Sequence, residues 1–525
     1  MKFKFFRKLK KLLESKAGGR DSQRATKKVM SSSNGSTAQC EENEANDYLQ
    51  WNPLSKSLLF SGVLTRRVGL DLSLHGAGNS LKVCHQRWVE LLTKNPDMKL
   101  AIIGGGIYGC HFAHVFDMAC KQVSAINEEG LINAKVVIFD KDNALFSQAS
   151  GKNSYRIHRG FHYPRSGQTR RRCYYDHNRF KVLYPQFFRT AHEIKDIPAY
   201  PKIFIVAKND ETKLDYDAMR HLFIGANFEE GQTMWEEIDG ELWSEDIRQS
   251  SNLDVMRKQM EEYGFDTDLI DGAFMVQVEP VLYADKPRTW FTKEFNNSPF
   301  VELKLSKRVD HEDVKGDHED KMIVHGEAFD LALNCTYNQA IPIQLEEHKA
   351  FYDLCISVIV AEKLHGGNPV VSFGIFDGPF PSLEPYDFSD KKNLPPEIQK
   401  YKDQNLFQIF DVKLSSVARV CDAHAAYKMM ESWEEKKRTG SNDYKELVRD
   451  IWIKCEKYFP RLGTDFELVG TWFALKTKVE DENAARPLIV LPDETVDRRG
   501  RFIQVFSSKL TSIFEAEEEV LNLIE

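Results

Sequence analysis

Apolar runs and helical periods alternate along the chain from residue 99 onward. The run Leu100 to Ile103 leads through glycines into a segment of helical periodicity, and a second apolar run, residues 136–139, ends at Asp140. Short buried strands joined by a helix predict a βαβ unit in a parallel sheet. Asp140 lies 31 residues after Gly109, where roughly 20 is usual, so we expect an extra polar loop near residues 121–133.

The later pattern predicts a second, strand-rich layer, because β-branched and aromatic residues are frequent between residues 350 and 420. A charged helical segment follows, and the last residues predict a strand, a small polar turn and an amphipathic helix. The expected helices cover residues 170–188, 210–270 (with Trp235 and Trp243 in the core), 421–460 (with Trp433 and Trp452 inward) and the segment after residue 509. The expected strands cover residues 201–208, 301–309, 354–361 and 502–506.

The first 97 residues differ from this pattern. Residues 1–47 are rich in Ser, Gly, Lys and Asn without apolar periodicity, which predicts a disordered basic tail. Residues 1–16 have the spacing of a basic amphipathic helix, so contact with an anionic membrane surface, or an organellar leader within residues 1–30, stays open. Residues 48–97 regain Trp, Leu and Val and predict a small appended element that ends in a helix around Trp88.

Composition narrows the class of protein. The chain has 525 residues, of which 42% are hydrophobic and 29% charged, as in globular proteins with more than one structural unit. The net charge of −8 provides no field that attracts nucleic acid. Nine cysteines without a C-x-x-C pair predict free thiols in a reducing, cytoplasmic location rather than a disulfide framework or a zinc site. No apolar run approaches the 18 or so residues that span a bilayer.

Three glycines after the first apolar run carry the first candidate chemistry. Gly104, Gly106 and Gly109 are in G-x-G-x-x-G register between a predicted strand and a predicted helix. Such a turn presents backbone N–H groups and the positive end of a helix dipole, which suit a pyrophosphate. The Asp140 carboxylate, at the end of the next strand, is placed to accept hydrogen bonds from ribose hydroxyls. These features predict a dinucleotide site.

The densest polar segment follows, over residues 147–165. His158 and His162 are candidate bases, because histidine changes its charge near neutral pH. Tyr163 is a candidate donor to a substrate oxygen. A solvated surface loop is the alternative interpretation of this segment. The candidates for binding a substrate carboxylate or phosphate through a bidentate fork are Arg156, Arg159 and Arg165.

Two motifs carry a family resemblance. Residues 149–166, ASGKNSYRIHRGFHYPRS, resemble the S-G-x-N-x-x-x-x-H-x-G-x-x-Y segment of FAD-dependent oxidoreductases of the D-amino-acid oxidase type, and fit an uncharacterised branch with R-x-H-x-G-x-H-Y-P-R-S better still. That family commonly has Glu where this chain has Asp140. Residues 507–512, SSKLTS, are similar to the G-G-K-L-T-T turn of flavin-dependent glycerol-3-phosphate dehydrogenases, with serine at both glycine positions.

The resemblance implies FAD as cofactor and an α/β fold. It implies a discontinuous Rossmann-like FAD-binding domain, over residues 98–165, 300–340 and 465–525, and a second, antiparallel or mixed β-sheet substrate domain, over residues 166–299 and 341–464. Because reduced flavin carries negative charge near N1 and O2, a lysine beside that edge would stabilise it. The further cofactor contacts that the resemblance implies are Lys141, Ser150, Asn153, Val309, Lys509, Leu510 and Thr511.

Together these features predict an FAD-dependent oxidoreductase that oxidises a small polar hydroxy- or amino-compound by hydride transfer to flavin N5. The expected partner is a small-molecule substrate, with anionic compounds included, and no metal is predicted. Two alternatives stay open: a flavoprotein without net redox turnover, mutase-like or regulatory, and an NAD(P)-dependent enzyme that uses the glycine motif alone. The predicted catalytic residues are His158, His162, Tyr163 and Arg159.

Overall fold

The computed structural model describes residues 72–126, 132–165, 167–188, 202–219, 247–248, 253–276, 279–317, 320–343, 350–363, 371–479 and 487–524, which all belong to the compact unit Ser57–Glu525. The predicted tail, the first part of the appended element, and Trp235 and Trp243 lie outside these residues. No helix in the described ranges combines the length and the apolar character that a bilayer span requires.

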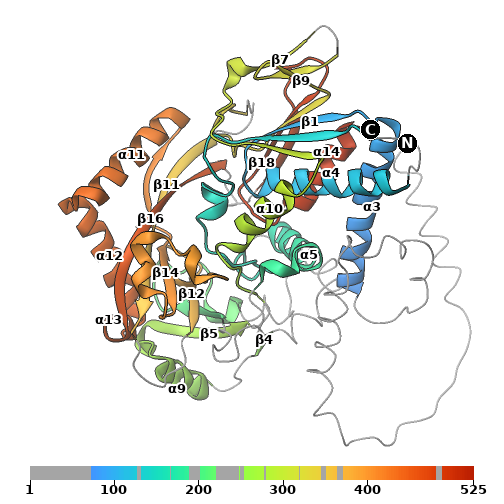
Figure 1. Cartoon of the computed structure of the whole chain (residues 1–525). Coiled ribbons are helices and arrows are strands. Elements are labelled where there is room, and N and C mark those ends of the chain that lie inside the picture. Colours follow the sequence, from blue (N-terminus) through green and yellow to red (C-terminus); the bar gives the residue numbers. More distant parts are fainter. Residues whose placement is uncertain are drawn as a thin grey trace, which may run out of the picture. The chain divides into compact units, whose positions relative to one another are not determined.

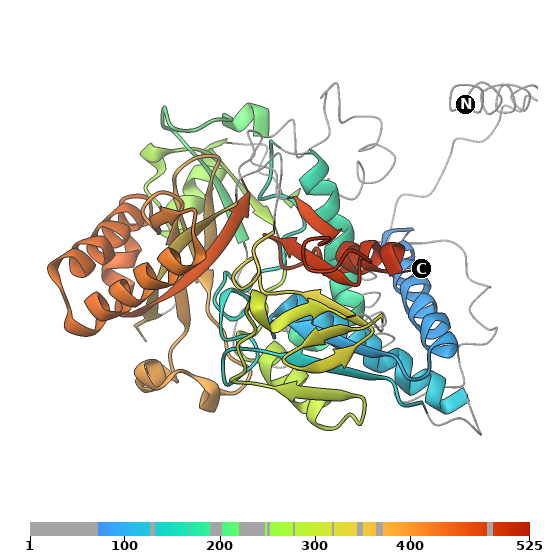
Figure 2. The ribbon, with the colours of Figure 1, turned by 90° about the horizontal axis from the view of Figure 1, so that it is seen from above.

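A six-stranded sheet contains the strand before the glycine turn and the strand that follows the next helix. Its order is β17–β18–β10–β1–β2–β6, and each neighbouring pair except β17–β18 is parallel. Early, middle and late parts of the sequence therefore meet in one sheet. Figure 2, seen from above, shows the separate three-stranded sheet of residues 314–329 in yellow in the foreground. The strands of the six-stranded sheet are β1 (Lys99–Ile103), β2 (Lys135–Phe139), β6 (Val301–Lys304), β10 (Leu331–Asn334), β17 (Leu488–Pro492) and β18 (Phe502–Ser507).

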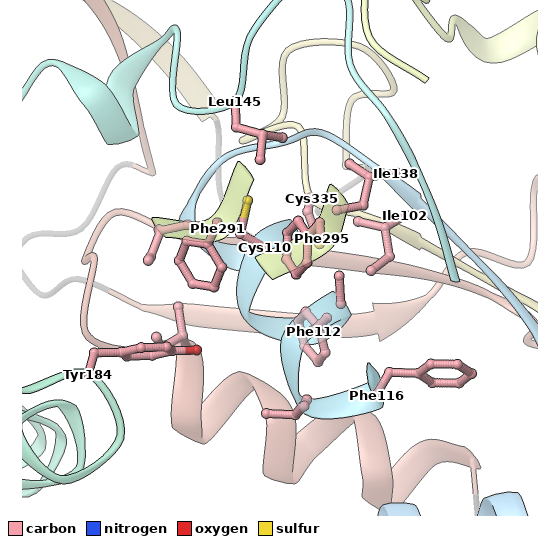
Figure 3. Packing of buried hydrophobic residues seen from close by; sticks show 14 of the residues in the cluster. Ile102, Cys110, Phe112, Phe116, Ile138, Leu145, Tyr184, Phe291, Phe295 and Cys335 are labelled. Atoms are coloured by element: carbon pink, nitrogen blue, oxygen red, sulfur yellow. The ribbon is translucent and has the colours of Figure 1, made fainter. Parts of the chain in front are cut away.

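Both faces of this sheet are covered. Successive residues of a strand point to opposite sides, so neighbouring residues pack against different layers. Ile102 packs with a layer of helices, whereas Ile103 packs with a small three-stranded sheet. Figure 3 shows Phe112 of α4 and Phe295 of α10 beside Ile102 in the helical layer. The helices of this layer are α3 (Leu72–Lys94), α4 (Ile107–Ile126), α5 (Gly167–Leu183), α10 (Lys286–Asn296) and α14 (Ile513–Ile524), and the small sheet contains β7 (Val314–Gly316), β8 (Met322–Val324) and β9 (Glu327–Phe329).

A nine-stranded mixed sheet forms the second layer. Its order is β15–β11–β14–β13–β12–β3–β5–β4, and β16 pairs with β11 in addition. Its strands are β3 (Lys202–Ala207), β4 (Ile247–Arg248), β5 (Ile270–Val276), β11 (Ala350–Glu362), β12 (Ser372–Phe376), β13 (Pro381–Pro385), β14 (Leu406–Asp411), β15 (Ser416–Val420) and β16 (Phe466–Val479).

The short 3₁₀ helices of the described chain are η1 (Ala149–Gly151), η2 (Pro185–Phe187), η3 (Thr267–Leu269), η4 (His311–Asp313), η5 (Lys391–Asn393) and η6 (Pro396–Tyr401).

The two faces of this second sheet differ in chemistry. Ile356, Ile409 and Leu475 point into an apolar core, which helices cover on the outside. Alternate positions of the same strands, such as Ser357 and Gln408, line a cavity instead. Figure 1 shows α11 and α12 beside β11 and β16. The covering helices are α9 (Leu253–Tyr263), α11 (Ala423–Thr439), α12 (Asn442–Tyr458) and α13 (Arg461–Asp465), and both Trp433 and Trp452 are packed against this core, as predicted.

Five segments differ from the sequence-based expectations. Strand β16, which the predicted boundary at residue 465 assigned to the FAD-binding domain, pairs along β11 in the nine-stranded sheet. Helices α5 and α10, assigned to the substrate domain, pack in the core of the first sheet. The amphipathic pattern of such segments does not tell which sheet they cover. Helix α4 continues to Ile126 into the expected polar loop, and the strand expected over residues 301–309 ends at Lys304.

Candidate functional site

The glycine turn joins β1 to α4 through close backbone contacts. Gly104 has a φ of 109°, and a Cβ there would lie 2.7 Å from the carbonyl oxygen of Cys335. A Cβ on Gly109 would lie 1.9 Å from the carbonyl oxygen of Gly104, so glycine is what lets α4 begin this close to the strand. A Cβ on Gly106 would meet the Ser150 hydroxyl at 2.9 Å. The first and third glycines thus fix the turn, while the second faces the segment that follows β2.

Asp140 braces this turn from the end of β2. One carboxylate oxygen accepts the N–H of Gly105 at 2.5 Å, and the other accepts the N–H of Asp142 at 2.8 Å. Burial raises the pKa of Asp140, and these two N–H groups act against that rise. The carboxylate lines the cavity described next, so its position agrees with a ligand contact while its hydrogen bonds hold the glycine turn.

A cavity of about 460 Å³ is lined by residues of both large sheets. Gly109 and Arg159 are not among its lining residues: Gly109 is buried against the turn, and Arg159 lies elsewhere. The structure thus brings together residues from the early, middle and late parts of the sequence. The predicted site residues that line the cavity are Gly104, Gly106, Asp140, Lys141, Ser150, Asn153, His158, His162, Tyr163, Val309, Lys509, Leu510 and Thr511.

One part of the cavity lies against the glycine turn and the strand ends. The Ser150 hydroxyl accepts the N–H of Ile107, in the first turn of α4, at 3.0 Å. The Asn153 amide donates to the carbonyl of Ser150 at 2.7 Å, and Gln408 of β14 donates to the carbonyl of Asn153 at 2.8 Å. These bonds connect the glycine turn of the first sheet to the second sheet.

Lys141 and Val309 mark another part of the cavity wall. The Lys141 ammonium donates to the Tyr427 hydroxyl at 2.9 Å and lies 4.1 Å from the centre of that ring. The Tyr427 hydroxyl in turn donates to Gln339, after β10. Val309 is buried against the small sheet. Helix α11, which carries Tyr427, therefore reaches from the second layer to the loops that follow β2 and β10.

Lys509 lies in the turn between β18 and α14. Its carbonyl accepts a hydrogen bond from the Tyr108 hydroxyl at 2.7 Å, which ties this turn to the start of α4. Its ammonium is buried, 2.7 Å from the Cys173 sulfur and 3.3 Å from the centre of the Tyr163 ring. Burial raises the pKa of Cys173 although Lys509 lowers it, so the thiol supplies no negative charge. Within the described ranges, Lys509 forms no ion pair with a carboxylate.

His158 is oriented by a buried carboxylate. Its Nδ1 lies 3.1 Å from Glu279 Oε2, and because a carboxylate is only an acceptor, Nδ1 is the donor. The other Glu279 oxygen accepts the N–H of Arg159 at 2.8 Å. The neutral imidazole of His158 therefore has Nε2 unprotonated and able to accept a proton. The ring of His162 stacks on that of His158, with centres 4.7 Å apart, and Tyr163 follows in the chain.

The three arginines of this segment have different partners. Arg156 Nε donates to Glu384 at 2.8 Å, and its other nitrogens donate to Ser372 and to the carbonyl of Glu279. The Arg159 guanidinium lies 4.8 Å from the centre of the Tyr174 ring, away from the cavity wall, which does not support its predicted catalytic role. Arg165 pairs with Asp377 at 2.8 Å near the surface.

Sequence reasoning missed Glu279 and Glu384. Both are buried, at 3% and 5% exposure, and each holds a residue of the polar segment from a distant part of the chain. Neither lies in a motif. The one signal in the sequence is that each acid interrupts an apolar, strand-like run, since both stand before a proline in a stretch of strand character.

Comparisons with known proteins agree with this architecture. No family model matches the chain. The FAD-dependent monooxygenase FPY4 of Fusarium mangiferae is 24% identical over 435 residues, which cover 82% of this chain and 92% of that protein. The FAD-dependent monooxygenase kojA of Aspergillus flavus is 21% identical over 444 residues, which cover 81% of this chain and 86% of that protein.

Solved structures give the fold. An L-α-glycerophosphate oxidase from Mycoplasma pneumoniae, with FAD bound, has a TM-score of 0.52 and 12% identity, covering 81% of this chain and 94% of that one. A glycine oxidase from Geobacillus kaustophilus has a TM-score of 0.50 and 13% identity, with the same two coverages. The chain thus has the α/β fold of FAD-dependent oxidoreductases of the D-amino-acid oxidase type, which confirms the predicted fold class.

Proposed function

We propose that this chain is an FAD-dependent oxidoreductase that oxidises a small polar hydroxy- or amino-compound. The observation that carries the proposal is that the glycine turn, the polar segment with His158, and the Lys509 turn line one cavity. The FAD-dependent relatives, which match about four-fifths of the chain, support the same function.

The residues that line the cavity fit a flavin dinucleotide. The Gly104–Gly106 turn and the first N–H groups of α4 suit the pyrophosphate, and Asp140 suits a ribose. Lys509 is a buried cation without a carboxylate partner among the described residues, and such a charge is stable when the ligand supplies the anion. A flavin, whose reduced form is anionic near N1 and O2, is a ligand of that kind.

FAD, when bound, supplies the acceptor for a hydride from the substrate carbon. His158 accepts the proton from the substrate hydroxyl or amine on Nε2, because Nδ1 is held by Glu279. The Glu279 carboxylate then stabilises the imidazolium that forms. Tyr163, fixed beneath the Lys509 ammonium, is placed to donate to a substrate oxygen. In this proposal His158 is the catalytic base and Glu279 is its positioning residue.

The experiment follows the flavin spectrum of the purified protein. We expect a yellow protein whose absorbance near 450 nm is bleached anaerobically by a hydroxy- or amino-compound. His158→Asn is expected to slow that bleaching by roughly a hundredfold or more, with flavin still bound. A protein that binds no FAD overturns the cofactor assignment, and unchanged bleaching in His158→Asn overturns the base. Flavin that no compound reduces favours the alternative without net redox turnover.

A monooxygenase reaction is the second candidate, because two curated relatives carry that name. Turnover under ¹⁸O₂ distinguishes the two reactions. An oxidase yields hydrogen peroxide and a product without the label, whereas a monooxygenase places one labelled oxygen atom in the product.

A further inference from the structure

We infer that the substrate end of the cavity accepts an uncharged, hydroxyl-bearing compound rather than a carboxylate or a phosphate. This inference rests on the proposed oxidoreductase function and narrows its substrate. It begins from the three arginines that the sequence marked as anion binders, since each of them is already occupied by the protein itself.

Of these three arginines, Arg156 lines the cavity, and all of its nitrogens have protein partners; Arg308, which also lines the cavity, pairs with Asp310. Nε donates to the Glu384 carboxylate at 2.8 Å, one terminal nitrogen donates to the Ser372 hydroxyl at 2.9 Å, and the other donates to the carbonyl of Glu279. Ser372 also donates to Glu384, at 2.9 Å. The fork that would bind a substrate carboxylate is thus closed by a carboxylate of the chain, and opening it would leave buried charges unpaired.

The charges around Arg156 balance without a ligand. Lys202 is buried and pairs with the second oxygen of Glu384. Arg156 and Lys202 supply two positive charges, and Glu384 and Glu279 supply two negative ones; His158 adds a charge only when it is protonated. A substrate anion placed here meets no unpaired cation among these four groups, so the desolvation of its charge is not offset. Lys509, the buried cation of the neighbouring turn, is assigned to the flavin in the proposed function.

The other two arginines do not change this balance. Arg159 lies over Tyr174 outside the cavity lining, and Arg165 is bound by both oxygens of Asp377, at 3.0 and 2.8 Å. Among the lysines that line the second sheet, Lys478 pairs with Asp353, and Lys476 lies 4.4 Å from the centre of the Phe410 ring.

The remaining wall of the second sheet suits hydroxyl groups. Ser357 and Ser382 line it and donate to the carbonyls of Ile409 and Phe410, which leaves their hydroxyl oxygens as acceptors. Gln408, which donates to the Asn153 carbonyl, adds a neutral amide, and Phe410 and Trp472 add apolar faces. A hydroxyl exchanges hydrogen bonds with water for bonds to such groups at little net cost, whereas a carboxylate also loses the solvation of its charge. The wall therefore favours the alcohol over the carboxylate when two ligands differ only in that group.

Matched ligand pairs test the inference on the flavin-loaded protein. D-Glucitol is compared with D-gluconate, and benzyl alcohol with benzoate, by the thermal unfolding midpoint and by perturbation of the 450 nm band. We expect the alcohol of a pair to raise the midpoint and to bind at least tenfold more tightly than the anion. Tighter binding of the anion in either pair overturns the inference.

Glu384→Gln provides the second arm. The variant leaves Arg156 and Lys202 with one fewer negative charge, so the affinity for gluconate or benzoate is expected to rise at least tenfold. The matched control is Asp377→Asn, which frees Arg165 outside the cavity and should leave anion affinity unchanged. The double variant Lys202→Met with Glu384→Gln restores the balance and should lose the gained affinity.

The outcomes separate this inference from the proposed function. If no alcohol binds and Glu384→Gln gains no affinity for anions, the inference is wrong, whatever the colour of the protein. If the protein holds no flavin and yet prefers alcohols to anions, the preference stands and the oxidoreductase function fails. Should Glu384→Gln not fold, the ligand pairs on the wild-type protein still decide.

Discussion

Glu384 shows how much one side chain depends on its neighbours. Burial by itself would raise the pKa of Glu384, but the charges of Lys202 and Arg156 outweigh it and lower that pKa from 4.5 to about 2. The pKa of Lys202 is lowered too, to about 8, because burial there outweighs the attraction of Glu384. For Glu384, the unfolded state binds more protons than the folded state between pH 2 and pH 4.5, so folding stability falls as the pH falls through that window.

This linkage gives a prediction for acid unfolding. Between pH 6 and pH 3 the wild-type protein should lose about 2 kcal/mol of unfolding free energy through Glu384 alone. The Glu384→Gln variant has no carboxyl group to titrate at this position. It should be less stable than the wild-type protein at pH 6, but its unfolding free energy should fall by about 2 kcal/mol less between pH 6 and pH 3. Urea unfolding at stepped pH measures the difference. Parallel curves for the two proteins would contradict the charge balance around Arg156.

Lys509 is the second residue whose charge can be tested. Lys509→Met should lower the flavin reduction potential by about 30 mV, the equivalent of about 1.4 kcal/mol for a two-electron couple, because the positive charge favours the reduced, anionic flavin. Lys509→Arg keeps the charge and is the control. Equilibration with a redox dye measures the potential. An unchanged potential in Lys509→Met would place the flavin away from this turn.

At this scale the sequence revealed the donors of the site but not their partners. The spacing of His158, His162 and Tyr163 marks a dense polar segment, and all three line the cavity. Glu279 and Glu384 are two among 79 acidic residues, and no local pattern distinguishes them. Their roles arise from contacts across more than a hundred residues of sequence, which neither periodicity nor spacing encodes.

The packing of the elements around the glycine turn depends on how closely α4 approaches β1. Helix α4 begins at Ile107, shortly after β1 ends at Ile103, and this close approach is possible because Gly109 has no Cβ to meet the carbonyl oxygen of Gly104. Local patterns predicted β1, α4, β2, β18 and α14, because an apolar run, a glycine turn and a helical period each leave a local signal. Strand β16 was assigned to the wrong sheet, since its pairing with β11 is a long-range choice.

Two glycine variants separate the structural role of this turn from its binding role. Gly109→Ala should destabilise the fold by about 3 kcal/mol, because a methyl group cannot lie 1.9 Å from the Gly104 oxygen. Gly106→Val should fold and yet bind no flavin, since its side chain meets the movable Ser150 hydroxyl and covers the turn. Gly470→Val, where nothing described lies within 4 Å, is the control. Thermal unfolding and flavin content are measured together; flavin retained by Gly106→Val would remove the turn from the site.

On the scale of the whole molecule, a buried polar network joins the start and the end of the described chain. Trp88 of α3 donates to Glu517 of α14 at 3.0 Å, and the other oxygen of Glu517 lies 3.1 Å from His111 of α4. His111 also contacts the Tyr184 hydroxyl at 2.8 Å. Helix α3, predicted as an appended element without an assigned role, is therefore part of the core behind the cofactor-binding sheet.

Trp88→Phe tests this network. The variant keeps most of the ring but removes the donor to a buried carboxylate, so it should cost about 1–3 kcal/mol of stability. Because α14 follows the Lys509 turn directly, we also expect faster flavin release from the variant. Trp452→Phe, on the outer helix α12, is the control. Thermal midpoints and flavin fluorescence after dilution are the measurements; equal release rates would show that α14 is held without Trp88.

The strand order of the first sheet has a consequence for biosynthesis. Strand β10 pairs with β18, whose residues leave the ribosome long after those of β10. At about 5–20 residues per second, the neighbouring edge stays unpaired for about 10–30 s during translation. The nascent polypeptide thus carries a half-built sheet with an open margin, an aggregation-prone surface of the kind that chaperones protect, and the Lys509 turn that completes the cavity lining is synthesised only after this interval.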